Sequence, residues 1–255
     1  MGSTASALIR GKVGPRRKAL TGVLTELVDS IVSGELREGA LLPAEESLLK
    51  RFQVSRTTLR ESLQHMVALG LIQATPRAGT VVQPKTAWNL LDPVVLSSAL
   101  RHNRERGFYD SLADARALIE PEAARLAALS ASPRSLAAIG NAFADMVDSQ
   151  GRDTQAWSEA DLSFHASIIE ASDNWVYRQF IVAIRAALLA SFQITNRASQ
   201  SHEEAIDLHR DVYDAIRSRR PEEAGTAMRR LIDRAREDMS RALTDTFDKA
   251  ERDMP

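Results

Sequence analysis

The segment Ser55–Arg60 constrains the fold of this chain more than any other stretch, and it directly follows a helical run at Pro43–Phe52 and a short turn. Ser55 suits the N-cap of a helix because its side-chain oxygen can accept a hydrogen bond from a free amide of the first turn. Arg56 and Arg60 are four residues apart and therefore share one helical face. The pattern predicts two short helices joined by a tight turn, with two arginines exposed on the second helix.

Two interpretations of this arginine face are open. Guanidinium groups at the start of a second helix can anchor phosphates and read base edges, as a DNA recognition helix does. The same pair is equally typical of a solvated helix surface, because short motifs often match by chance. The surrounding residues must decide between the two.

The flanking residues favour a DNA-binding domain. A helix before the motif is predicted by an apolar stripe at helical spacing, formed by Leu20, Val23, Leu24, Leu27 and Ile31. After the motif, Gly70 is a natural helix stop. Two short strands, 71–74 and 80–82, then flank a turn that carries Arg77 toward the DNA backbone or minor groove. Three helices and a small β-hairpin wing predict a winged helix-turn-helix.

Charge is distributed unevenly along the chain. Residues 1–86 contain 12 Lys and Arg against 7 Asp and Glu, and the remaining residues contain 21 against 27. A basic head on an acidic body fits a protein that meets nucleic acid at one end. The absence of cysteine excludes disulfides, thiolate metal ligands and thiol redox sensing. Without a spanning apolar run or a signal peptide, we expect a cytoplasmic protein with no membrane partner.

A length of 255 residues commonly corresponds to two domains. We expect a flexible basic leader at 1–17, the winged helix-turn-helix at 18–83, a Pro- and Trp-containing linker at 84–98, a helical effector-binding and dimerisation domain at 99–245, and a tail at 246–255. The helical domain shows helical periodicity throughout and no strand signal. The fold is therefore predicted to be mostly α, with an antiparallel all-α bundle after the DNA-binding head.

Three residues of the predicted bundle are candidate metal ligands. Asp161 and His165 are four apart on one helix, and His209 lies on a later helix. A carboxylate and two imidazoles that meet in a bundle core can bind a divalent transition metal and leave positions open for a ligand. The alternative is a surface hydrogen bond, which is the commoner role of an Asp–His pair at this spacing.

The head resembles a known family in four motifs with intact spacing: Leu42-Pro43-Ala44-Glu45, Val54–Glu61, Leu69–Ile72 and Gly79–Val82. They resemble the N-terminal domain of the GntR superfamily of bacterial transcription regulators. The resemblance implies that Arg56 and Arg60 contact operator DNA, that Ser55, Thr57 and Thr58 lie on phosphates, and that Gly79 lets the wing approach closely. The family often has an arginine where this chain has Glu46. We therefore expect operator affinity or sequence to differ from the family norm.

The second half resembles the FCD effector domain of the FadR branch, through Arg116–Glu120, Asp161–His165, Ala171–Asn174 and Leu208–Ile216. The resemblance implies a metal site of Asp161, His165 and His209, with zinc favoured and nickel or manganese possible. The family's third histidine falls opposite Leu231, which leaves three ligands.

Arg116, Glu120 and Asn174 are candidate effector-binding residues. The planar fork of Arg116 matches a carboxylate, although Arg116 and Glu120 equally fit an ordinary helical ion pair. The stretch Trp88–Leu96 resembles the galactonate-operon repressors (DgoR type) of this branch. That resemblance implies a sugar-acid effector of the galactonate or aldonate type.

We therefore predict a homodimeric, ligand-responsive DNA-binding regulator that represses a sugar-acid catabolic operon and is released by its effector; it is not an enzyme. One alternative is a regulator of the same family that senses a fatty acyl group or another small carboxylate. A metal-dependent hydrolase built on Asp161, His165 and His209 is less favoured, because it would not need Arg56 or Arg60.

Overall fold

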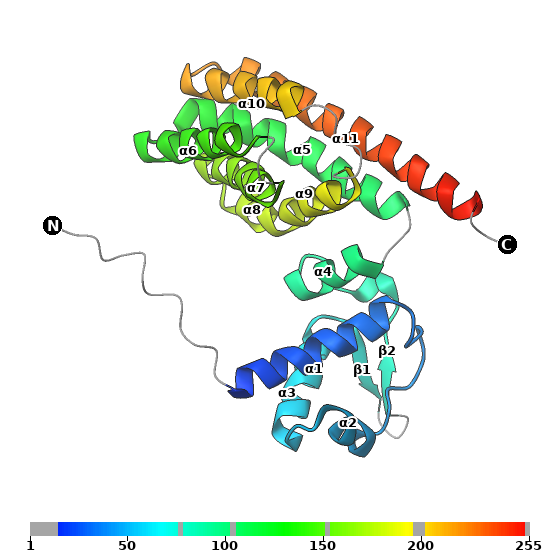
Figure 1. The fold of residues 1–255 in the computed structure, drawn as a ribbon. Coiled ribbons are helices and arrows are strands. Elements are labelled where there is room, and N and C mark those ends of the chain that lie inside the picture. Colours follow the sequence, from blue (N-terminus) through cyan, green and yellow to red (C-terminus); the bar gives the residue numbers. More distant parts are fainter. Residues whose placement is uncertain (1–14, 76–78, 103–105, 151–153, 196–201, 253–255) are drawn as a thin grey trace. The chain divides into compact units, whose positions relative to one another are not determined.

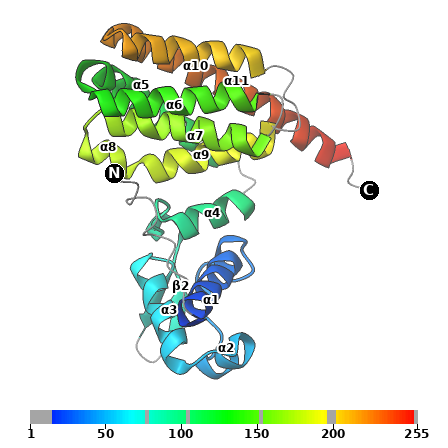
Figure 2. The ribbon, with the colours of Figure 1, turned by 60° about the vertical axis from the view of Figure 1, so that its left-hand side comes forward.

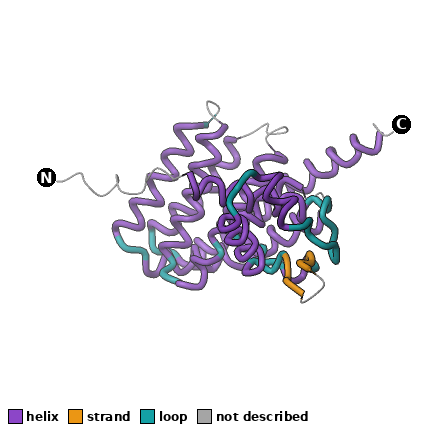
Figure 3. Tube along the Cα trace, turned by 90° about the horizontal axis from the view of Figure 1, so that it is seen from below, coloured by secondary structure: helices purple, strands orange, loops and turns teal. Residues whose placement is uncertain are grey.

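The computed structural model describes residues 15–75, 79–102, 106–150, 154–195 and 202–252 (Figure 1). The chain divides into two compact units, residues 1–103 and 104–255. Figure 3 shows that helices dominate both units and that one small hairpin supplies the strands of the described residues. No helix in these ranges is both long enough and apolar enough to span a bilayer.

The first unit contains the predicted three helices and hairpin: α1 (Pro15–Val32), α2 (Glu45–Phe52), α3 (Arg56–Ala68), β1 (Ile72–Thr75) and β2 (Gly79–Val82). The strands are antiparallel, with Ile72 opposite Val82 and Thr75 opposite Gly79. Buried apolar side chains from α1, α2, α3 and the hairpin form one core. The expected winged helix-turn-helix is confirmed.

Local backbone chemistry explains where these helices begin and end. The Ser55 hydroxyl caps α3 by accepting a hydrogen bond from the Thr58 amide at 3.1 Å. Gln53 ends α2 in the left-handed region, at φ 53°. Gly70 follows α3 with φ 72°, and a Cβ at this position would lie 2.1 Å from the Ala87 carbonyl oxygen. Only glycine meets both conditions without strain or a clash.

The predicted linker at 84–98 is wrong over most of its length. It contains a 3-10 turn, η1 (Lys85–Ala87), and the start of α4 (Pro93–His102). Val95 of α4 is fully buried in the core of the first unit. In addition, the Ser98 hydroxyl donates to Asp29 of α1 at 2.5 Å. The segment is ordered because its apolar residues pack on α1, so the second unit begins after α4 rather than at residue 99.

Both predicted chain ends also need a boundary correction. Helix α1 begins at Pro15, inside the expected leader of 1–17, because proline is well tolerated in a first helical turn. Residues 1–14 lie outside the described part of the chain. At the other end, α11 continues to Arg252, past the expected tail boundary at 246. Its last turns lack glycine and proline and are rich in helix-forming residues.

The second unit is the predicted all-α bundle: α5 (Arg106–Ser130), α6 (Pro133–Ser149), α7 (Thr154–Ala171), α8 (Trp175–Gln179), α9 (Ile181–Thr195), α10 (His202–Arg217) and α11 (Pro221–Arg252). Helix α5 packs against α11, α6 against α7, and α10 against α11 (Figures 1 and 2). Side chains of α5, α6, α7, α10 and α11 share one apolar core. This core holds α7 and α10 at the positions from which the candidate metal ligands project.

Candidate nucleic-acid interface and metal centre

Most of the residues predicted to contact DNA are exposed around the start of α3 in the first unit. Arg56 and Arg60 are exposed on one side of α3, with 62% and 66% of their side-chain surface accessible. Ser55 and Thr57 are also exposed beside them. Gly79 begins β2 with φ 98°, a conformation that favours glycine. Arg77 lies outside the described residues.

Thr58 differs from the expectation. Its residue surface is only 5% exposed, its amide donates to the Ser55 hydroxyl, and the two hydroxyl oxygens are 2.9 Å apart. The side chain is therefore engaged in the N-cap and is turned into the domain. Burial leaves no surface for the phosphate contact that the resemblance implied.

Sequence reasoning missed Glu45, the first residue of α2. One of its oxygens, Oε1, lies 3.2 Å from Nη1 of Arg56 and 3.6 Å from Nε of Arg60. The first contact is a hydrogen bond and the second an ion pair without one. The helix-turn-helix pairing of α2 with α3 was the available signal, because it brings the first turns of the two helices together.

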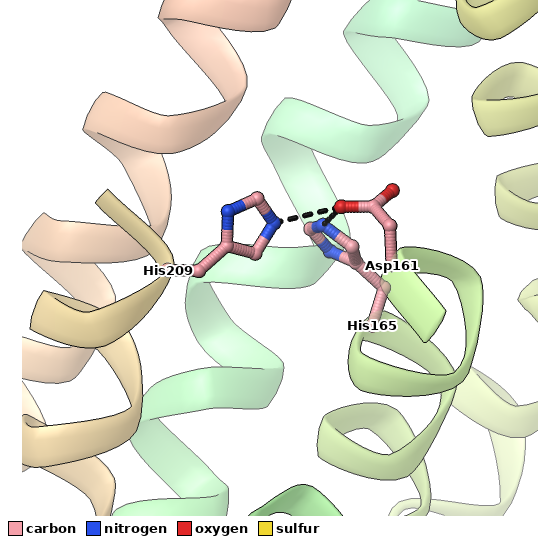
Figure 4. Close-up of side chains that lie close together, drawn as sticks. All are labelled: Asp161, His165 and His209. Atoms are coloured by element: carbon pink, nitrogen blue, oxygen red, sulfur yellow. Dashed lines mark ion pairs between the residues drawn. The ribbon is translucent and has the colours of Figure 1, made fainter. Parts of the chain in front are cut away.

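The three predicted metal ligands converge in the second unit. Asp161 and His165 project from α7 and His209 from α10, and they point toward one another in Figure 4. All three are at most 5% exposed. Asp161 Oδ1 lies 2.8 Å from His209 Nε2 and 3.8 Å from His165 Nε2. One ligand atom from each residue fits within a span of 4.8 Å.

The outer nitrogens of both imidazoles are held by acceptors. His209 Nδ1 lies 2.6 Å from the Ala205 carbonyl oxygen, and His165 Nδ1 contacts the Glu120 carboxylate. A carbonyl or an ionised carboxylate can only accept, so each Nδ1 must carry the proton. In a neutral ring the Nε2 lone pair then faces Asp161. This arrangement is typical of metal-ligating histidines, whose second nitrogen is fixed by an outer partner.

One buried atom shows that the cluster is incomplete as a hydrogen-bonded group. His209 Nε2 is close to Asp161, but among the described residues it has no partner with hydrogen-bond geometry. A nitrogen lone pair and a carboxylate oxygen at this distance repel each other in a buried site. A proton on Nε2 or a metal cation between the two atoms removes the repulsion, and both are compatible with the 2.8 Å separation. The donor set of one carboxylate and two imidazoles therefore fits a divalent transition metal.

Both buried carboxylates stay ionised despite burial. Burial raises the pKa of Glu120, but the Arg116 guanidinium and the His165 ring outweigh it and lower that pKa to about 2. Burial likewise raises the pKa of Asp161, whereas His209, His165 and Arg116 together hold it below its usual value. Asp161 is therefore available as an anionic ligand at neutral pH.

Two predicted effector residues have other tasks in the structure. Glu120 accepts from Arg116 Nε at 2.6 Å through one oxygen and contacts His165 through the other. Its carboxylate is thus used twice and would repel a carboxylate effector. The oxygen of Asn174 caps α8 by accepting from the Val176 and Tyr177 amides. Of the three candidates, Arg116 keeps the chemistry suited to an anionic effector.

The position opposite the family's third histidine gives no ligand. Leu231 is 5% exposed and belongs to the apolar core of the bundle. Within the described part of the chain, the cluster therefore offers three ligands, and a bound metal would keep coordination positions open for small molecules.

Both halves of the chain are similar to known proteins. Residues 21–82 match "Bacterial regulatory proteins, gntR family", and residues 111–234 match the FCD domain. The "Galactonate operon transcriptional repressor" of Escherichia coli strain K12 is 31% identical over 196 residues, which cover 76% of this chain and 85% of that protein. The chain belongs to the GntR family. This GntR regulator is a DNA-binding transcription regulator with an FCD domain.

Two further matches agree with the assignment. The "Uncharacterized HTH-type transcriptional regulator YieP" of the same E. coli strain is 32% identical over 204 residues, 78% of this chain and 86% of YieP. The solved structure of Lar, which controls the expression of the Listeria monocytogenes agr system, is similar in fold. The match covers 87% of this regulator and 96% of the Lar chain, with 18% identity and a TM-score of 0.55.

Proposed function

We propose that this regulator represses a sugar-acid catabolic operon of the galactonate or aldonate type and leaves its operator when the effector binds. The observation that carries the effector-binding half is the buried cluster of Asp161, His165 and His209, whose donor atoms fit a metal with open positions. The similarity to the galactonate operon repressor of E. coli supports the effector class.

The DNA-binding half of the proposal rests on the exposed arginines of α3. Helix-turn-helix proteins bind two half-sites about one turn of DNA apart, so a homodimer is expected. Because bacterial DNA lies in the cytoplasm, the regulator is expected to act there. We expect Arg56→Ala and Arg60→Ala each to weaken operator binding by roughly 1–3 kcal/mol. Arg217→Ala, which removes an exposed arginine of α10, is the charge-matched control and should leave binding unchanged. Mobility-shift titrations that show no loss for either α3 variant would remove that face from the interface.

For the effector domain, we propose that Asp161, His165 and His209 bind the metal, with zinc favoured over nickel and manganese. When bound, the ion supplies Lewis-acid positions for carboxylate and hydroxyl oxygens of a sugar acid. Arg116 supplies a buried positive charge beside the cluster, which favours an anionic ligand. Effector binding then shifts the equilibrium toward a form with lower operator affinity, which requires that the two forms bind the effector differently.

A matched pair of variants tests the effector half. We expect Asp161→Ala to retain operator binding and to abolish release by galactonate, with loss of bound metal measured by elemental analysis. The control Asp211→Ala removes an exposed carboxylate of α10 and should behave as wild type. Normal release by the Asp161 variant would show that no functional metal site exists.

The two alternatives make different predictions. A fatty acyl sensor does not need metal ligands, so stoichiometric metal in the purified protein and release by galactonate but not by acyl thioesters would exclude it. A hydrolase would turn over candidate esters or phosphates, and we expect no such turnover. Sedimentation of the purified chain as a monomer in the presence of operator would contradict the homodimer.

A further inference from the structure

Glu45 joins the two arginines of the recognition helix through a single oxygen. Its Oε1 lies within ion-pair distance of both Arg56 Nη1 and Arg60 Nε. Glu45 is itself half-buried, with 34% of its side-chain surface accessible, whereas each arginine side chain is more than 60% accessible. The anion is therefore the more fixed member of the group, and the two cations are arranged around it.

The electrostatics of the group follow from these positions. Two guanidinium charges four residues apart on one helical face repel each other, and Arg56 also lies at the positive end of α3. The Glu45 carboxylate between them offsets both effects. It also begins α2, where a negative charge interacts favourably with the first turn.

The same carboxylate affects the two modes of DNA binding differently. In nonspecific binding, arginines form ion pairs with phosphates. A phosphate that binds Arg56 or Arg60 therefore approaches the negative Glu45 carboxylate. In specific binding, the guanidinium forks meet base edges in the major groove, which carry no net charge. We propose that Glu45 is a specificity-determining residue, whose carboxylate positions Arg56 and Arg60 for base readout and penalises their use on phosphates. This inference rests on the proposed DNA-binding function.

The neighbouring residue supplies a matched control. Glu46 is exposed on the same first turn of α2, and no ion pair joins it to Arg56 or Arg60. Glu45→Gln and Glu46→Gln change the net charge of the domain equally and keep the side-chain shape. Full-length protein of each variant is titrated against a duplex that the wild type selects from a randomised library, and against a scrambled duplex of the same composition, over a range of salt concentrations. Thermal melting of each variant confirms that it is folded.

We expect Glu45→Gln to raise affinity for the scrambled duplex about five- to tenfold and to change affinity for the selected duplex by less than about twofold. The ratio of the two affinities then falls at least about twofold, and the salt dependence on the scrambled duplex steepens. Glu46→Gln removes a charge near the DNA that pairs with neither arginine, so it should change both affinities by about the same factor and leave their ratio unchanged. An equal change of the ratio in the two variants, or an unchanged ratio for Glu45→Gln, would overturn the inference. Failure of the wild type to select any duplex would instead overturn the proposed function.

Discussion

Replacing the buried Glu120 by glutamine should destabilise the effector domain strongly. The Glu120 and Arg116 side chains are 1% and 4% exposed, and glutamine would leave the guanidinium buried without its counter-charge. Breaking such a buried pair from one side costs about 3–5 kcal/mol. The pKa of Glu120 gives a consistent figure, because lowering it from 4.5 to about 2 corresponds to on the order of 3 kcal/mol of folding free energy.

The pH dependence of this contribution has a definite sign. The folded-state pKa of Glu120 lies below its unfolded value, so the contribution is complete above pH 4.5 and is lost as the pH falls toward 2. Urea denaturation of the full chain, followed by circular dichroism between pH 7 and pH 2.5, measures it. The difference between wild type and Glu120→Gln should be largest at neutral pH and should shrink below pH 4.5.

A second glutamate on the same helix provides the control. Glu122 accepts two hydrogen bonds from Arg125, at 2.6 and 2.8 Å, but 39% of its side chain is exposed. We expect Glu122→Gln to cost at most about 1 kcal/mol, since solvent screens a surface pair. If Glu120→Gln proves too unstable to measure, a double variant that combines Arg116→Gln with Glu120→Gln removes both charges. This double variant should be more stable than Glu120→Gln alone. Equal destabilisation by the two single glutamine variants would refute the reasoning from burial.

Four further outcomes can be measured. Glu120→Gln should weaken zinc binding about 10- to 100-fold in chelator competition, because an outer-sphere partner of His165 is altered. Zinc affinity should fall by at least about tenfold between pH 7.5 and pH 5.5, because protons compete for the imidazole nitrogens; a flat profile would exclude histidine ligation. Leu231→His should tighten zinc binding in chelator competition, because it adds a fourth ligand; unchanged affinity would show that position 231 does not reach the ion. In thermal melts, Gly70→Ala should cost roughly 2–4 kcal/mol, whereas Gly22→Ala, on an open helical surface, should stabilise by about 0.5–1 kcal/mol.

The DNA-binding head could be predicted because its determinants are local. The cap at Ser55, the left-handed turn at Gln53 and the glycine stop at Gly70 each depend on a few consecutive residues. The error over α4 has the opposite origin. A proline and a tryptophan near Val95 suggested a linker, and only packing against α1, distant in sequence, makes the segment part of the core.

The sequence predicted which residues form the metal cluster, but not which groups hold their side chains in place. Spacing placed Asp161 and His165 on one face, His209 followed as a candidate on a later helix, and the family resemblance then supported all three as one metal site. No pattern in the sequence indicates that the Ala205 carbonyl fixes the His209 ring, because the backbone of any helical residue offers the same group. The missing hydrogen-bond partner of His209 Nε2 likewise depends on angles that only the folded chain defines.

Helix α5 shows why a charge pattern does not determine a role. Arg116–Glu120 and Glu122–Arg125 both fit ordinary helical ion pairs in the sequence, yet one is buried and the other is solvated. Burial changes the chemistry of the carboxylate, since a buried anion must be satisfied completely and Glu120 achieves this by binding Arg116 and His165 together. Glu120 thereby connects Arg116, the residue best suited to an anionic effector, with His165, a candidate metal ligand. Effector binding at Arg116 would therefore be expected to alter metal affinity, and metal binding would alter effector affinity by the same factor.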